Sequence, residues 1–296
     1  MTLPPASAFP LLSAIDLEQL RPRLHRYCAR MLGSALDGED AVQEALLRVM
    51  EAPMPDRPLD NPEGWLFRIA HNVALDQLRR RARLDAASSE DDPDSLVDPV
   101  DEQARREAAA ASLPAFMQVP ALQRSAVILF DVLEYSAEEV SHILGSTVPA
   151  VKSALQRGRS RLRELARPTG AAGKQAALSS AEQRLLQRYV DLFNARDFDT
   201  LRTMLAADVQ LDLVNRLQLQ GAAVGEYFSR YGQTQGWHAW PGVVEGRPAV
   251  LIRQHRRTDG LVDYFVVLGW SGEQVSTIRD FLFARYVMAD VEPGPL

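Results

Sequence analysis

The sequence predicts a multidomain protein with two all-α domains, the second containing a helix-turn-helix, followed by an α+β domain with an antiparallel sheet. Apolar residues recur at helical spacing over residues 13–83 and 104–165, whereas strand-like segments occur only after residue 236. Helices followed by hairpin-linked strands are typical of an α+β fold or of separate domains. At 296 residues, the chain exceeds what one hydrophobic core usually fills.

Three helices make up the first predicted domain. The first spans about Ser13–Leu32, and the second spans Asp37–Glu51. After a proline-rich loop, Asn61 provides an N-cap, Pro62 fits the first helical turn, and the third helix continues to about Arg83.

The outward faces of the second and third helices differ in chemistry. On the second helix, Asp40, Gln43 and Glu44 face outward and either are merely solvated or meet a protein surface. The third helix has a basic, amidic and aromatic stripe that can neutralise phosphates, read a base edge and stack on a base. Core packing of Trp65, which begins the stripe, is an equal alternative. Its other members are Arg68, Asn72, Asp76, Arg79 and Arg83.

Two breaker-rich segments separate the predicted domains. Residues 85–102 contain eight acids and no base, and residues 168–180 are rich in Gly, Ala and Ser, so both favour linkers over folded elements. We therefore expect domains at 10–84, 104–167 and 180–296, with linkers at 85–103 and 168–179. In the second domain, residues 104–117 and 120–133 predict two helices that pack under the helix-turn-helix.

The helix-turn-helix is predicted over residues 136–165. Ser136 and Glu139 have the spacing of a capping box, and Gly145 ends the first helix. Thr147 offers a second N-cap, and Pro149 fits the next helical turn. A short glycine turn before a basic helix is typical of modules whose second helix enters the major groove of DNA.

Local charge supports DNA binding although the formal net charge is −6. The exposed flanks of the second helix present long cationic donors, while the acids are concentrated in the first linker. The alternative is an ordinary helical hairpin with a solvated charged face. The cations are Lys152, Arg157, Arg159, Arg161 and Arg163.

The third domain is predicted to begin with helices at 180–194, 197–206 and 222–231. Strands follow at 237–245, 249–255, 261–270 and 275–288, separated by the turn signals at 245–246, 259–260 and 271–272. In the last strand, Asp280 lies among apolar neighbours. It either serves as an acid or base in a small-molecule pocket, or it pairs with an arginine such as Arg253 or lies at a domain contact. The histidines show no metal-ligand spacing, and we expect no metal or cofactor.

Sequence features also favour a cytoplasmic location. Cys28 is the only cysteine and has no internal disulfide partner, and the first 20 residues lack the basic start of a signal peptide. No apolar run approaches the roughly 20 residues that span a bilayer.

Three motifs resemble a known family: GEDAVQEALLRVME, NPEGWLFRIAHNVALDQLRRR, and ALQRSAVILFDVLEYSAEEVSHILGSTVPAVKSALQRGRSRLREL. In this order they resemble the two conserved domains of bacterial extracytoplasmic-function sigma factors. The resemblance implies that Asp40, Gln43 and Glu44 bind the polymerase clamp. It also implies that residues 52–62, with Asn72, Asp76, Arg79 and Arg80, capture the minus-ten element. Minus-35 reading is then expected from Lys152, Ser153, Gln156 and Arg157, with Arg159 among the DNA contacts.

The sequence departs from the family pattern in places, and its last domain resembles a second family. Ala154 stands where a basic residue is common, and Pro149 where a small residue or Gly is common, so an unusual minus-35 preference is expected. Residues 189–212 and 278–288 resemble the SnoaL-like cone-shaped domain. This implies a regulatory domain that contacts the sigma domains and binds at most a small effector.

The predicted function is that of a non-catalytic sigma factor that recruits RNA polymerase to promoters. Two alternatives remain: from the enzyme class, a SnoaL-like enzyme with a regulatory helical region, and, within the DNA-binding class, a homodimeric helix-turn-helix repressor. A simple repressor would not need residues 61–83. Binding to core polymerase without DNA would distinguish a sigma factor from a repressor.

Overall fold

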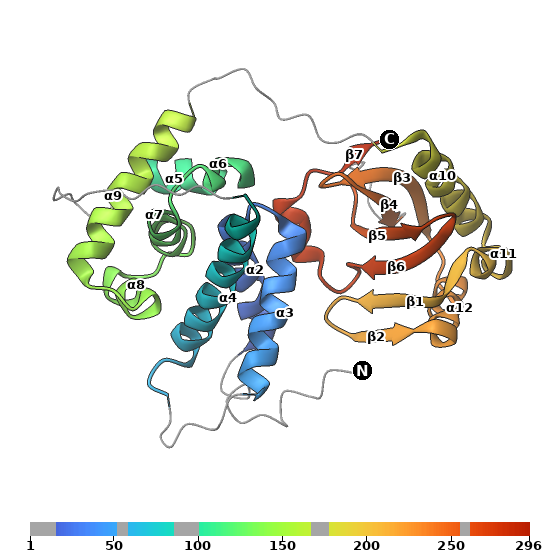
Figure 1. Ribbon diagram of the computed structural model, residues 1–296, viewed down its shortest axis with the longest axis horizontal. Helices are drawn as coiled ribbons and strands as arrows, with labels where there is room; N and C mark the ends of the chain where they lie inside the picture. The colour runs from blue at the N-terminus through green and yellow to red at the C-terminus, as the bar shows by residue number, and fades with distance from the viewer. Residues whose placement is uncertain (1–15, 52–58, 86–100, 167–177, 255–260) are drawn as a thin grey trace. The chain divides into compact units, whose positions relative to one another are not determined.

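The computed structural model describes residues 16–51, 59–85, 101–166, 178–254 and 261–296 (Figure 1). Its contacts divide the chain into two compact units, one within residues 5–171 and the other mainly within residues 172–296. We call these the helical unit and the sheet unit. The expected loop at 52–58, most of the acidic linker and most of the second linker lie outside the described residues.

The helical unit begins with three helices: α2 (Leu17–Leu32), α3 (Ala35–Glu51) and α4 (Pro62–Asp85). The side chain of Asp16 accepts hydrogen bonds from the first turn of α2, and Gly33 ends this helix in the left-handed conformation, with φ 74°. Asn61 Oδ1 accepts a hydrogen bond of 2.7 Å from the Gly64 amide, which confirms the predicted cap of α4.

The second helical region contains α5 (Glu102–Ala110), α6 (Leu113–Met117), α7 (Ala121–Val127), a π-helical segment η2 (Ile128–Val132), α8 (Ala137–Leu144) and α9 (Val148–Leu165). The capping box of Ser136 and Glu139 is confirmed, and Gly145 ends α8 with φ 63°. Thr147 caps α9. The expected helix at 104–117 is divided because Ala111 is extended and Ser112 starts a new helix.

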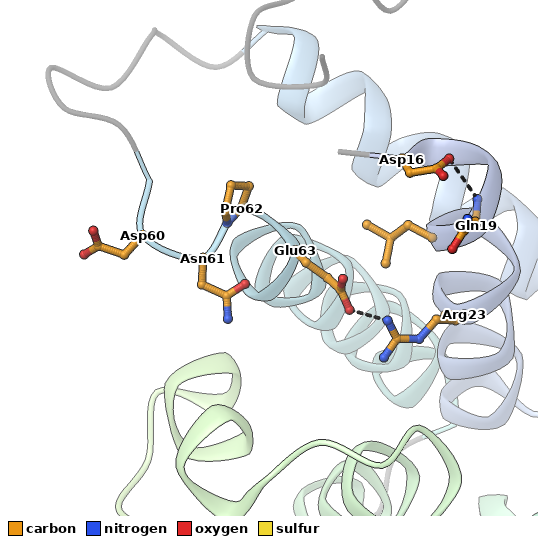
Figure 2. A pocket seen from close by; sticks show the side chains of 8 residues that line it. Asp16, Gln19, Arg23, Asp60, Asn61, Pro62 and Glu63 are labelled. Carbon is orange, nitrogen blue, oxygen red and sulfur yellow. Dashed lines mark hydrogen bonds and ion pairs between the residues drawn. The ribbon is translucent and has the colours of Figure 1, made fainter. Parts of the chain in front are cut away.

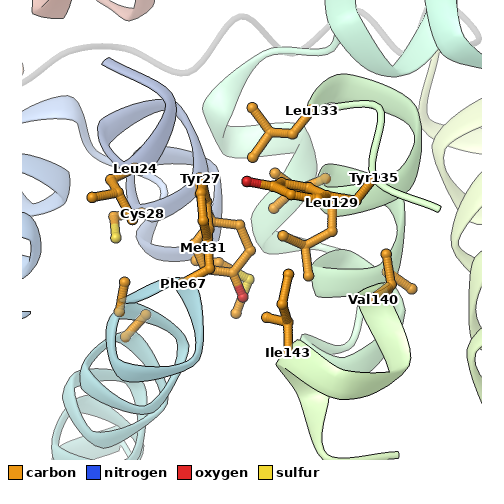
Figure 3. Packing of buried hydrophobic residues seen from close by; sticks show 14 of the residues in the cluster. Leu24, Tyr27, Cys28, Met31, Phe67, Leu129, Leu133, Tyr135, Val140 and Ile143 are labelled. Carbon is orange, nitrogen blue, oxygen red and sulfur yellow. The ribbon is translucent and has the colours of Figure 1, made fainter. Parts of the chain in front are cut away.

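A shared apolar core joins α2–α4 to the second helical region (Figure 3). Phe67 of α4 makes edge contacts with Tyr27 of α2 and with Tyr135, which precedes α8, at centroid distances of 5.8 and 5.2 Å. Such pairs contribute about 0.5–1.5 kcal/mol each beyond their buried area. Met31 and Ile143 belong to the same core, so the two helical regions form one packed body.

Three helices and a seven-stranded sheet form the sheet unit. The helices α10 (Ser180–Ala195), α11 (Phe198–Thr203) and α12 (Gly225–Gln233) bury Tyr189, Leu201 and Phe228 in a core shared with the sheet. The sheet order is β2-β1-β6-β5-β4-β3-β7. The strands are β1 (Leu205–Leu213), β2 (Leu217–Gln220), β3 (Trp237–Val244), β4 (Arg247–Gln254), β5 (Tyr264–Ser271), β6 (Gln274–Asp280) and β7 (Gly294–Pro295).

The sheet differs from the prediction in two respects. β1, β2 and β7 were not predicted, and β1 pairs in parallel with β6, so the sheet is mostly rather than wholly antiparallel. β6 ends at Asp280 instead of continuing to residue 288, because a turn and a 3₁₀ helix (Arg285–Asp290) follow it. The hairpins β3–β4 and β5–β6 turn as their glycine signals predicted.

Asp280 lies at the end of β6, fully buried among tyrosines of the sheet unit. The hydroxyls of Tyr227 and Tyr231 each donate to Asp280 Oδ2 at 2.8 Å, and the Leu282 amide donates to Oδ1 at 2.8 Å. Tyr231 also lies 3.2 Å from the Tyr264 hydroxyl. The expected pairing with an arginine such as Arg253 is therefore wrong, because tyrosine hydroxyls from α12 occupy the carboxylate.

Burial raises the pKa of Asp280, while the two tyrosine hydrogen bonds oppose this shift. The folded state therefore holds the proton of this carboxyl more tightly than the unfolded chain does. Its contribution to stability is fully present below the unfolded pKa of about 3.9 and is lost as the pH rises through the raised folded pKa.

We predict that Asp280→Asn removes this pH dependence. As the pH rises from about 4, the melting temperature of the wild type should fall relative to that of the variant. Fluorescence-detected unfolding can measure this, because three of the four tryptophans, Trp237, Trp240 and Trp270, belong to the sheet unit. A difference between the two proteins that stays constant with pH would contradict the prediction.

Candidate nucleic-acid interface

The first half of α9 carries the predicted DNA-reading residues. Val151, Ala154 and Leu155 are buried, and Lys152, Ser153, Gln156 and Arg157 are all half-buried on the remaining surface. Arg157 Nη1 donates to Ser153 Oγ at 3.1 Å, which orders the guanidinium along the helix. The reading residues therefore follow the capped turn directly, on the side of α9 that does not pack inward.

Gly158 explains how closely α9 packs on α7. A Cβ atom at this position would lie 2.6 Å from a methyl carbon of Val127 and 2.9 Å from the carbonyl oxygen of Gln123. A larger residue would push α9 away from the helix that supports it. The sequence pattern predicted the inward stripe, but not this close approach of two helices.

Arg159 does not fit the expected role as a DNA contact. Its side chain is 6% exposed and forms a bidentate ion pair with Asp131 of η2, at 2.9 Å from Nε to Oδ2 and 2.6 Å from Nη2 to Oδ1. It also lies over the ring of Phe130. Because all these contacts are internal, Arg159 fixes α9 to η2 and is not available to a phosphate in this conformation.

The second predicted DNA surface lies on α4. Arg68, Asn72, Arg79 and Arg80 are exposed, and Asp76 is half-buried. Asp76 lies 3.5 Å from both Arg48 of α3 and Arg79. These pairs hold the carboxylate among cations, so the α4 face as a whole remains basic. Trp65 is half-buried and packs against the apolar core, which leaves both of its predicted roles open.

A pocket of about 330 Å³ lies between the first turns of α2 and α4, next to the end of the predicted minus-ten loop (Figure 2). Its size is at the lower end of the range for small-molecule sites. The lining is mainly polar, with amides, carboxylates and one guanidinium. It consists of Asp16, Gln19, Leu20, Arg23, Asp60, Asn61, Pro62 and Glu63.

The α3 face contains the predicted polymerase-binding residues. Asp40 is exposed, and Gln43 and Glu44 are half-buried. Glu44 pairs with Arg48 at 2.6 Å, and it accepts a hydrogen bond from Gln77 of α4 at 3.3 Å. The α3 face is therefore held against α4 by polar contacts.

Leu47 is a member of the α3 face that sequence analysis missed. Its side chain is 42% exposed, one turn after Glu44 and two turns after Asp40. The signal was present, because an apolar residue at these spacings from two outward polar residues must also face outward. A single exposed leucine is ordinary on a protein surface, so Leu47 bears on a protein contact only through its place beside Asp40 and Glu44.

The described residues contain no group of three or more histidine, cysteine or acidic side chains placed to hold a metal ion. Within the same residues, no helix is both long enough and apolar enough to cross a membrane.

Two family models match the helical unit. The Sigma-70 region 2 model matches residues 17–84, which include α2–α4, and the Sigma-70, region 4 model matches residues 115–162, which include the helix-turn-helix. The two matched segments correspond to the two helical regions of the structure.

Curated relatives include two sigma factors of Mycobacterium tuberculosis. The ECF RNA polymerase sigma factor SigG is 34% identical over 216 residues, which cover 64% of this chain and 58% of the relative. SigM is 35% identical over 144 residues, which cover 48% of this chain and 71% of SigM. The chain thus spans somewhat less than two thirds of the SigG length.

Solved structures also align with part of this chain. A protein of Kribbella flavida described as a candidate ketosteroid isomerase aligns with 34% of this chain and 77% of its own, at 22% identity and a TM-score of 0.28. The sheet unit itself has an α+β architecture, in which three helices share a core with the sheet. The similarity to SigM, together with the two Sigma-70 matches, shows that the chain belongs to the extracytoplasmic-function sigma factors of RNA polymerase.

Proposed function

We propose that this chain binds core RNA polymerase and directs it to promoters. The observation that carries the proposal is the presence of two separate surfaces on one helical unit: an α3 face with acids and an exposed Leu47, and a helix-turn-helix with cationic donors on α9. The first suits a protein surface and the second suits DNA. The domains at 10–84, 104–167 and 180–296 are part of this proposal, as is a cytoplasmic location.

The promoter contacts are proposed residue by residue. Lys152, Ser153, Gln156 and Arg157 read the minus-35 element in the major groove. The α4 face, with Asn72, Asp76, Arg79 and Arg80, holds the minus-ten strand together with the loop that ends at Pro62. The pocket beside this loop is lined by amide and carboxylate groups, which can accept and donate to the edge of an unpaired base.

The double variant Asp40→Lys, Leu47→Ser should lower the affinity for core polymerase by about tenfold or more, since it removes the exposed apolar anchor and reverses a charge. Analytical pull-down or fluorescence titration with purified core polymerase, without DNA, measures the effect. Exposed substitutions usually change stability by less than about 0.5 kcal/mol, so the fold should be retained. Glu273→Lys in the β5–β6 turn is a control with similar charge change. Wild-type affinity in the double variant would refute the assignment.

Lys152→Ala and Arg157→Ala should leave polymerase binding intact and weaken promoter use. Loss of a phosphate contact lowers the slope of log affinity against log salt concentration by about one. Loss of a base contact instead relaxes the sequence preference at one position of the promoter. Run-off transcription at several salt concentrations distinguishes these effects. Arg106→Ala on the exposed side of α5 serves as the matched loss of charge. If both variants supported normal transcription, α9 would not be the reading helix.

For the sheet unit we propose a regulatory role without catalytic turnover, in which it binds at most a small effector. Asp280 supports this view, because its carboxylate oxygens are already occupied by Tyr227, Tyr231 and the Leu282 amide. The competing enzyme function would require this fully buried carboxyl group to become accessible to a substrate. Turnover by the full chain that is lost in Asp280→Asn would establish the enzyme instead.

Regulation is proposed to act through contact between the sheet unit and the sigma domains. A fused domain has a high effective concentration, so a weak contact suffices. A preference of about 1.4 kcal/mol for an inactive arrangement leaves roughly one molecule in ten active. Ending the chain at residue 171 should then raise transcription severalfold at equal protein levels. Equal transcription by the two proteins would exclude this regulation.

A further inference from the structure

Two residues of the pocket at the start of α4 also hold the two helical regions together. Arg23 Nη1 pairs with Glu63, and Arg23 Nη2 donates to the carbonyl oxygen of Leu133 at 3.4 Å. The Tyr135 hydroxyl donates to the same Glu63 oxygen, and the Arg23 guanidinium lies 4.9 Å from the centroid of the Tyr135 ring. We call Arg23, Glu63, Leu133 and Tyr135 the junction. Figure 2 shows its two pocket residues paired.

The closed helical unit is too small to reach both promoter elements. Elements centred at positions −10 and −35 lie about 25 base pairs apart, which is roughly 85 Å of duplex at 3.4 Å per base pair. A compact body of about 150 residues has a radius of gyration of about 15 Å, so its opposite surfaces are roughly 40–50 Å apart. The α9 and α4 surfaces can therefore contact their elements together only after the two helical regions separate.

The contact between the two helical regions is suited to separation, because it contains polar groups. Water can form hydrogen bonds with these groups once the regions separate. The Tyr27 hydroxyl donates to Ser125 Oγ of α7 at 3.4 Å, and Arg124 Nη1 donates to the carbonyl oxygen of Met31. Interfaces between domains that move are likewise more polar than permanent cores. The junction differs from these buried groups, since Arg23 and Glu63 are 37% and 38% exposed and open to the pocket.

We propose that the pocket and the junction compete for Arg23 and Glu63, so that single-stranded promoter DNA in the pocket and closure of the helical unit disfavour each other. The inference rests on the proposed sigma function and adds a regulation to its minus-ten site. In the closed unit, one Glu63 oxygen accepts from both Arg23 and Tyr135. Once Tyr135 leaves, that oxygen is available to an exocyclic amino group of a base, and Arg23 is released from Leu133.

This competition is reciprocal. If closure weakens strand binding by some factor, strand binding weakens closure by the same factor. Capture of the minus-ten strand therefore favours release of the helix-turn-helix toward the minus-35 element. The coupling requires no contact between DNA and Tyr135.

Tyr135→Phe tests the proposal in the full chain without polymerase. The variant loses the hydroxyl that bonds to Glu63 and keeps the ring beneath Arg23. Fluorescence anisotropy with a labelled pool of random-sequence single-stranded DNA should show binding about three- to tenfold tighter than that of the wild type, as expected for the net contribution of one ordinary hydrogen bond. Tyr286→Phe, a hydroxyl loss in the sheet unit, should leave the affinity unchanged.

Hydrogen–deuterium exchange over residues 128–135 provides the second readout. Exchange should be faster in Tyr135→Phe, and adding the DNA pool should accelerate it in the wild type. Faster exchange with unchanged affinity would show that pocket and junction are independent, and unchanged exchange would show that Tyr135 does not hold the closure. Absence of DNA binding by both proteins would overturn the proposal as well. Because polymerase is absent, these results are separate from those that test polymerase recruitment.

Discussion

Phe67 makes the contact on which the rest of the helical unit depends. Its ring packs against Tyr27 on one side and Tyr135 on the other, so one side chain of α4 belongs to the cores of both helical regions. The polar bonds of Glu63 and His71, which also lie on α4, surround this aromatic contact. The helix that carries the proposed minus-ten face is thus also the helix that holds the helix-turn-helix in place.

This double use of α4 relates the architecture to the proposed function. An apolar core gives the unit one defined closed form, and polar groups such as Arg23 and Glu63 also bridge its two helical regions. By contrast, the bidentate ion pair between Arg159 and Asp131 is buried, and it fixes α9 to η2. The helix-turn-helix can therefore move as one body without losing its own shape.

Contacts between neighbouring residues were predictable from the sequence, whereas contacts between residues far apart in the chain were not. The caps at Asn61, Ser136 and Gly145 depend on neighbouring residues, and the structure confirms them. Arg159 was placed on the DNA face because Asp131 lies 28 residues away and no periodic pattern connects them. Asp280 was likewise given an arginine partner, although Tyr227 and Tyr231 share one side of α12 and lie about 50 residues earlier. The strand β1 was missed because its parallel partner, β6, follows some 60 residues later.

The most direct test of the account is a distance measurement between the two DNA-binding helices. Spin labels at Ala82→Cys in α4 and Ser160→Cys in α9 occupy exposed positions, and the native Cys28 is buried with a raised pKa, which keeps it unreactive. For the free chain, dipolar electron spin resonance should give one short distance between the two labels. When core polymerase and promoter DNA are added, this distance should become tens of ångströms longer, because the two promoter elements lie roughly 85 Å apart. An unchanged distance in that complex would contradict the account.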